Sequence, residues 1–150
     1  MAVALTDQVR VYHLLHEEFR QFHCYEIKNV KKIRFSSGGQ FLVVADHKKM
    51  FIFHTYSLEK IKDISCPSQS ISNLAFNYDD SEMTFVSSDG MLQNFDLMEF
   101  SKIGETRILR NSNYRSACFL STPQDSESKV ITVGQEKDVG GSLKIFNTAS

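Results

Sequence analysis

Apolar residues recur along this chain in runs of strand length, and three of these runs are versions of one segment. The three versions occupy residues 30–36, 71–77 and 114–120. Phenylalanine stands at the same place in each, as Phe35, Phe76 and Phe119, with separations of 41 and 43 positions. A repeat of this length is typical of architectures that array small antiparallel sheets of four strands.

Alternating and continuous apolar runs predict strands throughout the chain and no helix. Residues 7–13 alternate, with Val9 and Val11 set against Arg10 and Tyr12, as in a strand with two different faces. A second strand is expected around residues 19–24. Each later unit then reads as an apolar inner strand, a turn, a second apolar strand, a tight turn, a third strand ending in an aromatic residue, and an outer strand.

This order divides the chain into four all-β units. They are the end of one unit at 7–24, full units at 28–64 and 69–108, and an incomplete unit at 112–147 that stops before an outer strand. Glycines at Gly38, Gly39 and Gly90 supply the backbone freedom that tight turns need. The last unit carries two longer polar loops, 122–128 and 135–141, whose length indicates either a contact or tolerance of insertion.

Composition places the chain among globular proteins and narrows its compartment. It has 150 residues, 41% hydrophobic and 23% charged. The longest apolar runs, such as 41–45, are far shorter than the roughly 20 residues of a membrane helix, so no membrane span is expected. The first residues lack the basic region of a secretory signal. Three cysteines, Cys24, Cys66 and Cys118, predict reduced thiols buried in or near strands, and therefore a reducing compartment.

Each predicted third strand ends in an aromatic residue followed by a short polar one. These pairs are Tyr12-His13, Phe53-His54, Phe95-Asp96 and Phe146-Asn147, and the hairpin ahead of the first three holds Asp7, Asp46 or Asp89. The pattern resembles degenerate WD40 repeats, which implies an all-β WD40-type β-propeller: a partial arc of about three blades plus two strands of a preceding blade. The resemblance implies structural roles for Asp46, Phe53, Asp89, Phe95 and Phe146.

The sequence departs from that family at its most diagnostic residues. Tryptophan is absent, and no Gly-His dipeptide precedes an inner strand. The Asp-His-Ser/Thr-Trp hydrogen-bond network that stiffens typical WD40 blades is therefore not expected here.

Four further segments resemble the cilia- and flagella-associated WD-repeat family. They are residues 7–15, 35–41, 55–59 and 77–81. This resemblance implies a non-enzymatic scaffold or adaptor of the ciliary or flagellar axoneme, part of the cytoskeleton, that supports inner dynein arm anchoring and ciliary motility. The implied partners are other axonemal proteins, including tubulin or dynein-associated subunits. The coiled coil of that family is not expected in this chain, which has no heptad region.

The number of strands predicts that the arc cannot close by itself. The pattern supplies about 13 strands, whereas even four blades of four strands need about 16. We expect either a fragment of a longer polypeptide or one part of a split propeller that another chain completes. The end faces of such an arc would leave apolar side chains uncovered, including Val9, Val11, Ile145 and Phe146.

Candidate chemistry is weak at every position. His23-Cys24 is the one adjacent metal-ligand pair, and the histidines His13, His16, His47 and His54 are scattered, so no metal or cofactor is expected. Gly140-Gly141 lacks the context of a phosphate loop.

Two other groups favour structural roles over chemistry. Asp79-Asp80 lies in a turn, where aspartate caps its own backbone, so we assign no catalytic residue. The phenylalanines fit a core between blades better than a stacking platform for nucleic acid.

Charge is the remaining candidate for recognition. Residues 28–62 hold eight basic groups against two acidic ones. Such a segment can steer an acidic partner, and it can equally discourage aggregation at a strand edge. Lys31, Lys32, Lys48 and Lys49 are the candidate partner-binding residues, and with the ciliary resemblance the acidic surface of tubulin is the expected target.

Two classes of function stay open at this point. One is the axonemal scaffold, and the alternative is a general intracellular WD40 protein-interaction module outside cilia, such as a trafficking or ubiquitin assembly. A propeller enzyme would need convergent polar residues at a central channel, and none can be assigned.

Overall fold

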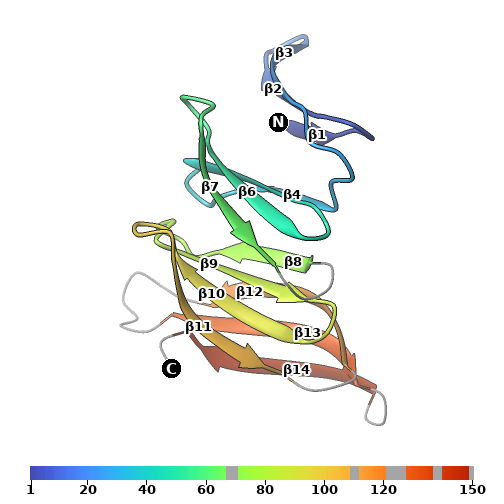
Figure 1. Ribbon diagram of the computed structural model, residues 1–150, viewed down its shortest axis with the longest axis vertical. Helices are drawn as coiled ribbons and strands as arrows, with labels where there is room; N and C mark the ends of the chain where they lie inside the picture. The colour runs from blue at the N-terminus through green and yellow to red at the C-terminus, as the bar shows by residue number, and fades with distance from the viewer. Residues whose placement is uncertain (67–70, 109–111, 121–127, 137–139, 149–150) are drawn as a thin grey trace.

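A computed structural model describes residues 1–66, 71–108, 112–120, 128–136 and 140–148. Within these ranges the chain is all-β, with fourteen strands in four antiparallel sheets and no helix. Each sheet consists of strands that are consecutive in the chain. The partial propeller arc expected from the sequence is therefore the observed architecture (Figure 1).

The four sheets are numbered I to IV in chain order. Sheet I contains β1 (Ala2–Ala4), β2 (Val9–Leu14) and β3 (Phe19–Tyr25). Sheet II contains β4 (Lys32–Phe35), β5 (Phe41–Ala45), β6 (Lys49–His54) and β7 (Lys60–Ser65). Sheet III contains β8 (Ile71–Phe76), β9 (Glu82–Ser87), β10 (Met91–Asp96) and β11 (Ser101–Arg107). Sheet IV contains β12 (Ser112–Leu120), β13 (Lys129–Glu136) and β14 (Gly140–Asn147).

Two elements differ from the prediction. Sheet I has a third strand, β1, whose residues Ala2 and Ala4 pair with Val11 and Val9. Three residues are too few to show a period of two in the sequence, and β1 was therefore not predicted. The described chain thus has one strand more than expected. The predicted loop 135–141 is also wrong, because β13 and β14 continue pairing as far as Glu136 and Gly140. The loop predicted at 122–128 lies almost entirely outside the described residues.

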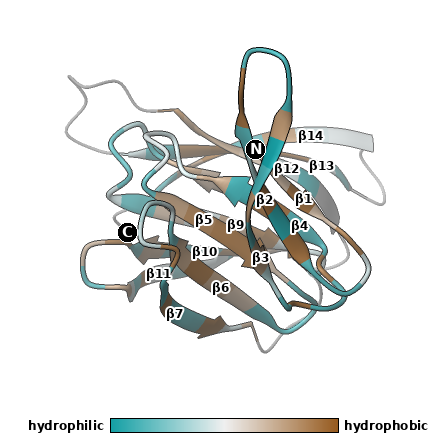
Figure 2. Cartoon of the chain, turned by 90° about the horizontal axis from the view of Figure 1, so that it is seen from above, coloured by the Kyte–Doolittle hydropathy of each residue, from teal (hydrophilic) through white to brown (hydrophobic). Residues whose placement is uncertain are grey.

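The sheets stack face to face in chain order, with sheet I at one end of the arc and sheet IV at the other (Figure 1). The first strands of neighbouring sheets contact one another: β4 with β8, and β8 with β12. Apolar stretches run along the strands inside the stack (Figure 2). The hydrophobic core therefore lies between sheets rather than within any one of them.

The first inter-sheet layer overturns one expectation about uncovered residues. Val9 and Val11 are 0% and 6% exposed, because they point toward sheet II and pack in a cluster with Leu42 and Val44. At the other end of the arc, Ile145 is 56% exposed, as expected. Phe146 is half-buried, because it faces sheet III.

The cysteines occupy three different environments. Cys66 is buried, Cys24 is half-buried, and all three thiols, including that of Cys118, are free. The expectation that every thiol would be buried is wrong for Cys118, which is exposed on β12 because its side chain lies on the face of sheet IV that none of the other described sheets covers.

Candidate protein-interaction surface

The structure brings the four candidate lysines to one edge of sheet II. Lys31 and Lys32 lie at the start of β4, and Lys48 and Lys49 lie in the hairpin between β5 and β6. The backbone N–H of Lys31 donates to the carbonyl of Ala45 at 2.7 Å, and Lys32 is the register partner of the same residue. Ala45 is the last residue of β5, so the Lys31–Lys32 pair and the Lys48–Lys49 pair lie at the same end of that strand. We call these four lysines the basic edge.

Asp46 fixes the backbone of the hairpin that carries half of the basic edge. Its Oδ1 accepts the backbone N–H groups of Lys48 and Lys49 at 2.6 and 2.7 Å. The backbone N–H of Cys66 donates to the carbonyl of Lys48 at 2.7 Å. Burial, together with the negative charge of Asp46, raises the pKa of the Cys66 thiol to about 11. The hydrogen bonds with Asp46 and with Cys66 therefore hold the hairpin in place.

The ammonium groups of the basic edge are available to a partner. All four lysines are exposed, and within the described residues none of them forms an ion pair. Lysines on the outer strands differ, since Lys60 pairs with Asp63 and Lys102 with Glu105. Unpaired exposed ammonium groups on one edge attract anionic surfaces, with a strength that falls as salt rises.

Arg34 belongs to the same basic segment, is also exposed, and bridges two sheets. Its Nη1 donates to the carbonyl of Leu74 at 2.7 Å and so ties β4 to β8. A groove of about 600 Å³ lies beside the basic edge, between sheets I and II. Its lining includes Lys28, Asp46, Phe51 and Lys60.

The aromatic residues that end the third strands point into the layers between sheets. Phe53 and Phe95 are 5% and 6% exposed, and Phe146 is half-buried. The ring of Phe53 lies 4.1 Å from that of Tyr25 in sheet I, measured between centroids. Phe95 stacks on Phe85 at 5.7 Å. Each of these aromatics therefore helps to attach its sheet to the preceding one.

Asp89 occupies in sheet III the place that Asp46 has in sheet II, but it makes a different contact. It accepts a short hydrogen bond from the hydroxyl of Ser87, beside the turn at Gly90, where φ is 80°. No lysine lies in this hairpin. The basic edge is therefore a feature of sheet II that the equivalent hairpin of sheet III does not share.

Asp80 is the contact that the sequence reasoning missed. Asp79, not Asp80, caps the turn: the hydroxyl and backbone N–H of Ser81 donate to it and lower its pKa. Asp80 is buried and reaches back to sheet II, where it accepts the Ser36 hydroxyl at 2.6 Å and the backbone N–H of Gly38 at 2.9 Å. Asp80 aligns with Gly39 in the repeat, and both residues have positive φ, but this alignment does not indicate the contact with sheet II.

Within the described residues, no three His, Cys, Asp or Glu side chains are grouped so as to hold a metal ion. The same residues contain no helix with the length and apolar character needed to cross a bilayer.

Four antiparallel sheets stacked face to face, with the third-strand aromatics of sheets II, III and IV turned toward the preceding sheet, define a partial β-propeller of the WD40 type. Among solved structures, the chain is similar to the β-propeller domain of Cps50 (Swd1) from Myceliophteria thermophila, with a TM-score of 0.58 and 13% identity. That likeness covers 79% of this chain and 39% of the other. It concerns the fold alone.

The sequence is similar to cilia- and flagella-associated protein 57 from Mus musculus, with 27% identity over 146 residues. The match covers 95% of this chain but only 11% of that relative's length. No family model matches the chain.

Proposed function

We propose that this chain is part of a ciliary or flagellar scaffold that binds other proteins of the axoneme. The observation that carries the proposal is the likeness to cilia- and flagella-associated protein 57 along nearly the whole chain. The stacked sheets support it, because rigid blades present loops and edges at fixed positions to partners. The units proposed at 7–24, 28–64, 69–108 and 112–147 would be consecutive blades of this scaffold.

The localisation of the protein in a ciliated cell tests the proposal. A tagged full-length protein should remain with demembranated axonemes, and its loss should reduce beating while dynein ATPase activity in extracts persists. That result would support a role in anchoring inner dynein arms. A protein released entirely with the detergent-soluble fraction would instead favour the alternative, a general intracellular interaction module.

The basic edge supplies a proposed partner within the axoneme, the acidic surface of tubulin. Changing Lys31, Lys32, Lys48 and Lys49 to Glu should weaken co-sedimentation with microtubules about tenfold or more at low salt, because attraction becomes repulsion. The matched control changes Lys60, Lys62, Lys102 and Lys129 to Glu, which alters net charge equally. Equal losses in both variants, or no loss in either, would remove tubulin as the specific target of this edge.

A further inference from the structure

The stack carries equivalent grooves on the side of its outer strands. One lies between sheets I and II and has a volume of about 600 Å³, and another lies between sheets II and III, with about 450 Å³. We call them the I–II groove and the II–III groove. Each is lined by the third-strand aromatic of its second sheet, Phe53 or Phe95, and by the register partner of that aromatic on the outer strand, Lys60 or Lys102. The two grooves are therefore the same site of the repeat.

The II–III groove is lined by polar groups that pair with one another. Gln93 lies in the lining two places before Phe95, and its Nε2 donates to Glu105 Oε2 at 3.2 Å. Lys102 forms an ion pair with the same carboxylate. These contacts satisfy the hydrogen-bonding groups of the lining within the chain, so they favour no particular ligand.

The I–II groove has an aromatic ring at the position of Gln93. This residue is Phe51, whereas the equivalent residues of sheets I and IV are Arg10 and Lys144. Phe51 is half-buried in the groove lining, and Lys60 Nζ lies 6.0 Å from the centroid of its ring. Because the other three sheets have polar residues here, the repeat itself does not require an aromatic residue. A partly exposed ring in a groove is suited to contact an apolar or aromatic side chain.

The charges at the I–II groove favour an acidic occupant. Lys28 lies in the lining, exposed and without an ion pair among the described residues. Lys48 and Lys49 of the basic edge follow the lining residue Asp46 in the same hairpin. The lining also contains exposed Glu26, while Asp46 is half-buried and already accepts two backbone N–H groups. The positive field of the basic edge therefore extends into the groove.

A second copy of this chain matches these requirements poorly. Phe19 is 66% exposed and follows Glu17 and Glu18, but Arg20 comes next and cancels half of their charge. Tyr78 is 51% exposed in a turn with one exposed acidic neighbour. The continuity of the I–II groove with the basic edge instead favours the acidic partner that this edge is proposed to bind.

We propose that the I–II groove binds an acidic peptide segment of that partner and that an aromatic side chain of the segment packs on Phe51. Lys28, Lys48 and Lys49 attract its carboxylates. This inference rests on the proposed function, in which the basic edge binds an acidic protein, and it adds a chemical requirement. Negative charge alone is not sufficient, because the groove also selects an aromatic residue within the acidic segment.

Fluorescence anisotropy with two labelled peptides tests the proposal on the full-length protein. One probe has a phenylalanine flanked on each side by a run of glutamates, and the other has alanine in its place. The phenylalanine probe should bind about tenfold more tightly, because the ring contact adds to the attraction between charges. Equal binding of the two probes, or no binding of either, overturns the proposal. This comparison needs no variant of the protein.

Substitutions in the two equivalent grooves locate the contact. Phe51→Gln gives the I–II groove the residue of the II–III groove and should bind both probes about as weakly as the unchanged protein binds the alanine probe. Gln93→Ala is the matched control and should keep the tenfold preference. A further loss with the alanine probe, to about 100-fold in total, would mean that Phe51 and the probe ring act independently, and would overturn the proposal.

Two further measurements separate this inference from its alternatives. Sedimentation of the protein alone should show no self-association that depends on Phe51, and self-association removed by Phe51→Gln would assign the groove to a second copy and overturn the proposal. Axonemal retention decides the proposed function separately. A protein that prefers the phenylalanine probe but is absent from axonemes contradicts the proposed function alone, and a retained protein without that preference contradicts the inference alone.

Discussion

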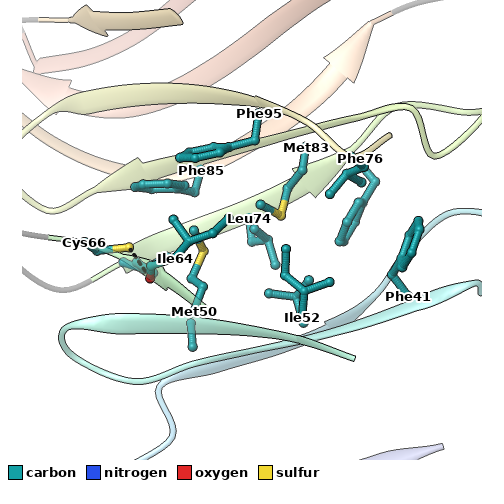
Figure 3. Close-up of a cluster of buried hydrophobic side chains, with 14 residues drawn as sticks. Phe41, Met50, Ile52, Ile64, Cys66, Leu74, Phe76, Met83, Phe85 and Phe95 are labelled. Carbon is teal, nitrogen blue, oxygen red and sulfur yellow. Dashed lines mark hydrogen bonds between the residues drawn. The ribbon is translucent and has the colours of Figure 1, made fainter. Parts of the chain in front are cut away.

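The layer between sheets II and III and the layer between sheets III and IV are built from equivalent positions with different chemistry. The first is a cluster of fourteen buried residues from both sheets, rich in Phe, Met, Leu and Ile (Figure 3). Among the described residues, the second has a buried cluster of Val86, Leu92, Ile108, Ala117 and Val130, with Phe119 and Phe146 packed against it. Its polar contacts include one within sheet III, where Thr84 Oγ1 donates to Asn94 Oδ1 at 2.7 Å, and one across the layer, where Asn94 Nδ2 donates to the carbonyl of Thr148, just after β14, at 3.4 Å.

The difference teaches that one repeat can join its sheets in two ways. Apolar contact stabilises in proportion to the area buried and tolerates small shifts. Hydrogen bonds between buried groups contribute less net energy but fix the relative position of the two sheets, since a shift leaves a donor or acceptor unpaired. Hydrogen bonds also cross the II–III layer, from Arg34, Ser36 and Gly38, so we expect this layer to dominate stability. We expect the III–IV layer to depend more on its polar contacts.

Phe85→Ala should have the largest effect on this comparison. Phe85 is 1% exposed and stacks on Phe95 within the II–III layer. Its truncation leaves a cavity and should lower the free energy of unfolding by about 3–5 kcal/mol, measured by urea denaturation. Ile103→Ala on exposed β11 is the control. A loss below about 1 kcal/mol for Phe85→Ala would mean that the large apolar layer is not the stable one.

Asp80→Ala comes next, because it removes one of the polar contacts between sheets II and III. The Ser36 hydroxyl and the Gly38 N–H both lose their carboxylate acceptor, so we expect about 2–3 kcal/mol of destabilisation. Asp80→Asn retains an amide oxygen and tolerates the positive φ of 60° at this position, and should cost less. Equal losses in the two variants would indicate that the negative charge of the carboxylate, rather than an acceptor oxygen or the backbone conformation, sets the effect.

Substitutions at Thr84 and Asn94 test the polar layer and should have the smallest effects. Asn94→Ala should lower the free energy of unfolding by about 1–2 kcal/mol, because the buried Thr84 hydroxyl loses the nearer of its two acceptors and keeps the Gln93 carbonyl at 3.2 Å. Thr84→Val combined with Asn94→Leu removes both partners, and its free energy of unfolding should be within about 1 kcal/mol of that of the parent chain. Calorimetric melting of the set checks the order. A double variant less stable than Asn94→Ala would contradict the pairwise account.

The repeat made most of the architecture predictable, since alternation and terminal aromatics mark strands locally. β1 was missed because Ala2–Ala4 is too short for a period to appear. The convergence of Lys31 and Lys32 with Lys48 and Lys49 follows from their places at the ends of neighbouring strands. The role of Asp80 could not be predicted, because its turn resembles a self-capping one and its partners lie 44 and 42 residues away. Contacts between sheets depend on stacking, which local pattern does not encode.

The consecutive order of strands within each sheet has a consequence for how the chain folds. Every ladder joins neighbours in sequence, so each can form as a series of hairpins, a process that takes about 1–10 μs. Contacts between sheets link segments about forty residues apart and are slower to form, because longer loops must close first. Folding can then propagate from sheet to sheet, as in a linear array. The central pair of sheets can therefore reach its native packing before either outer sheet docks.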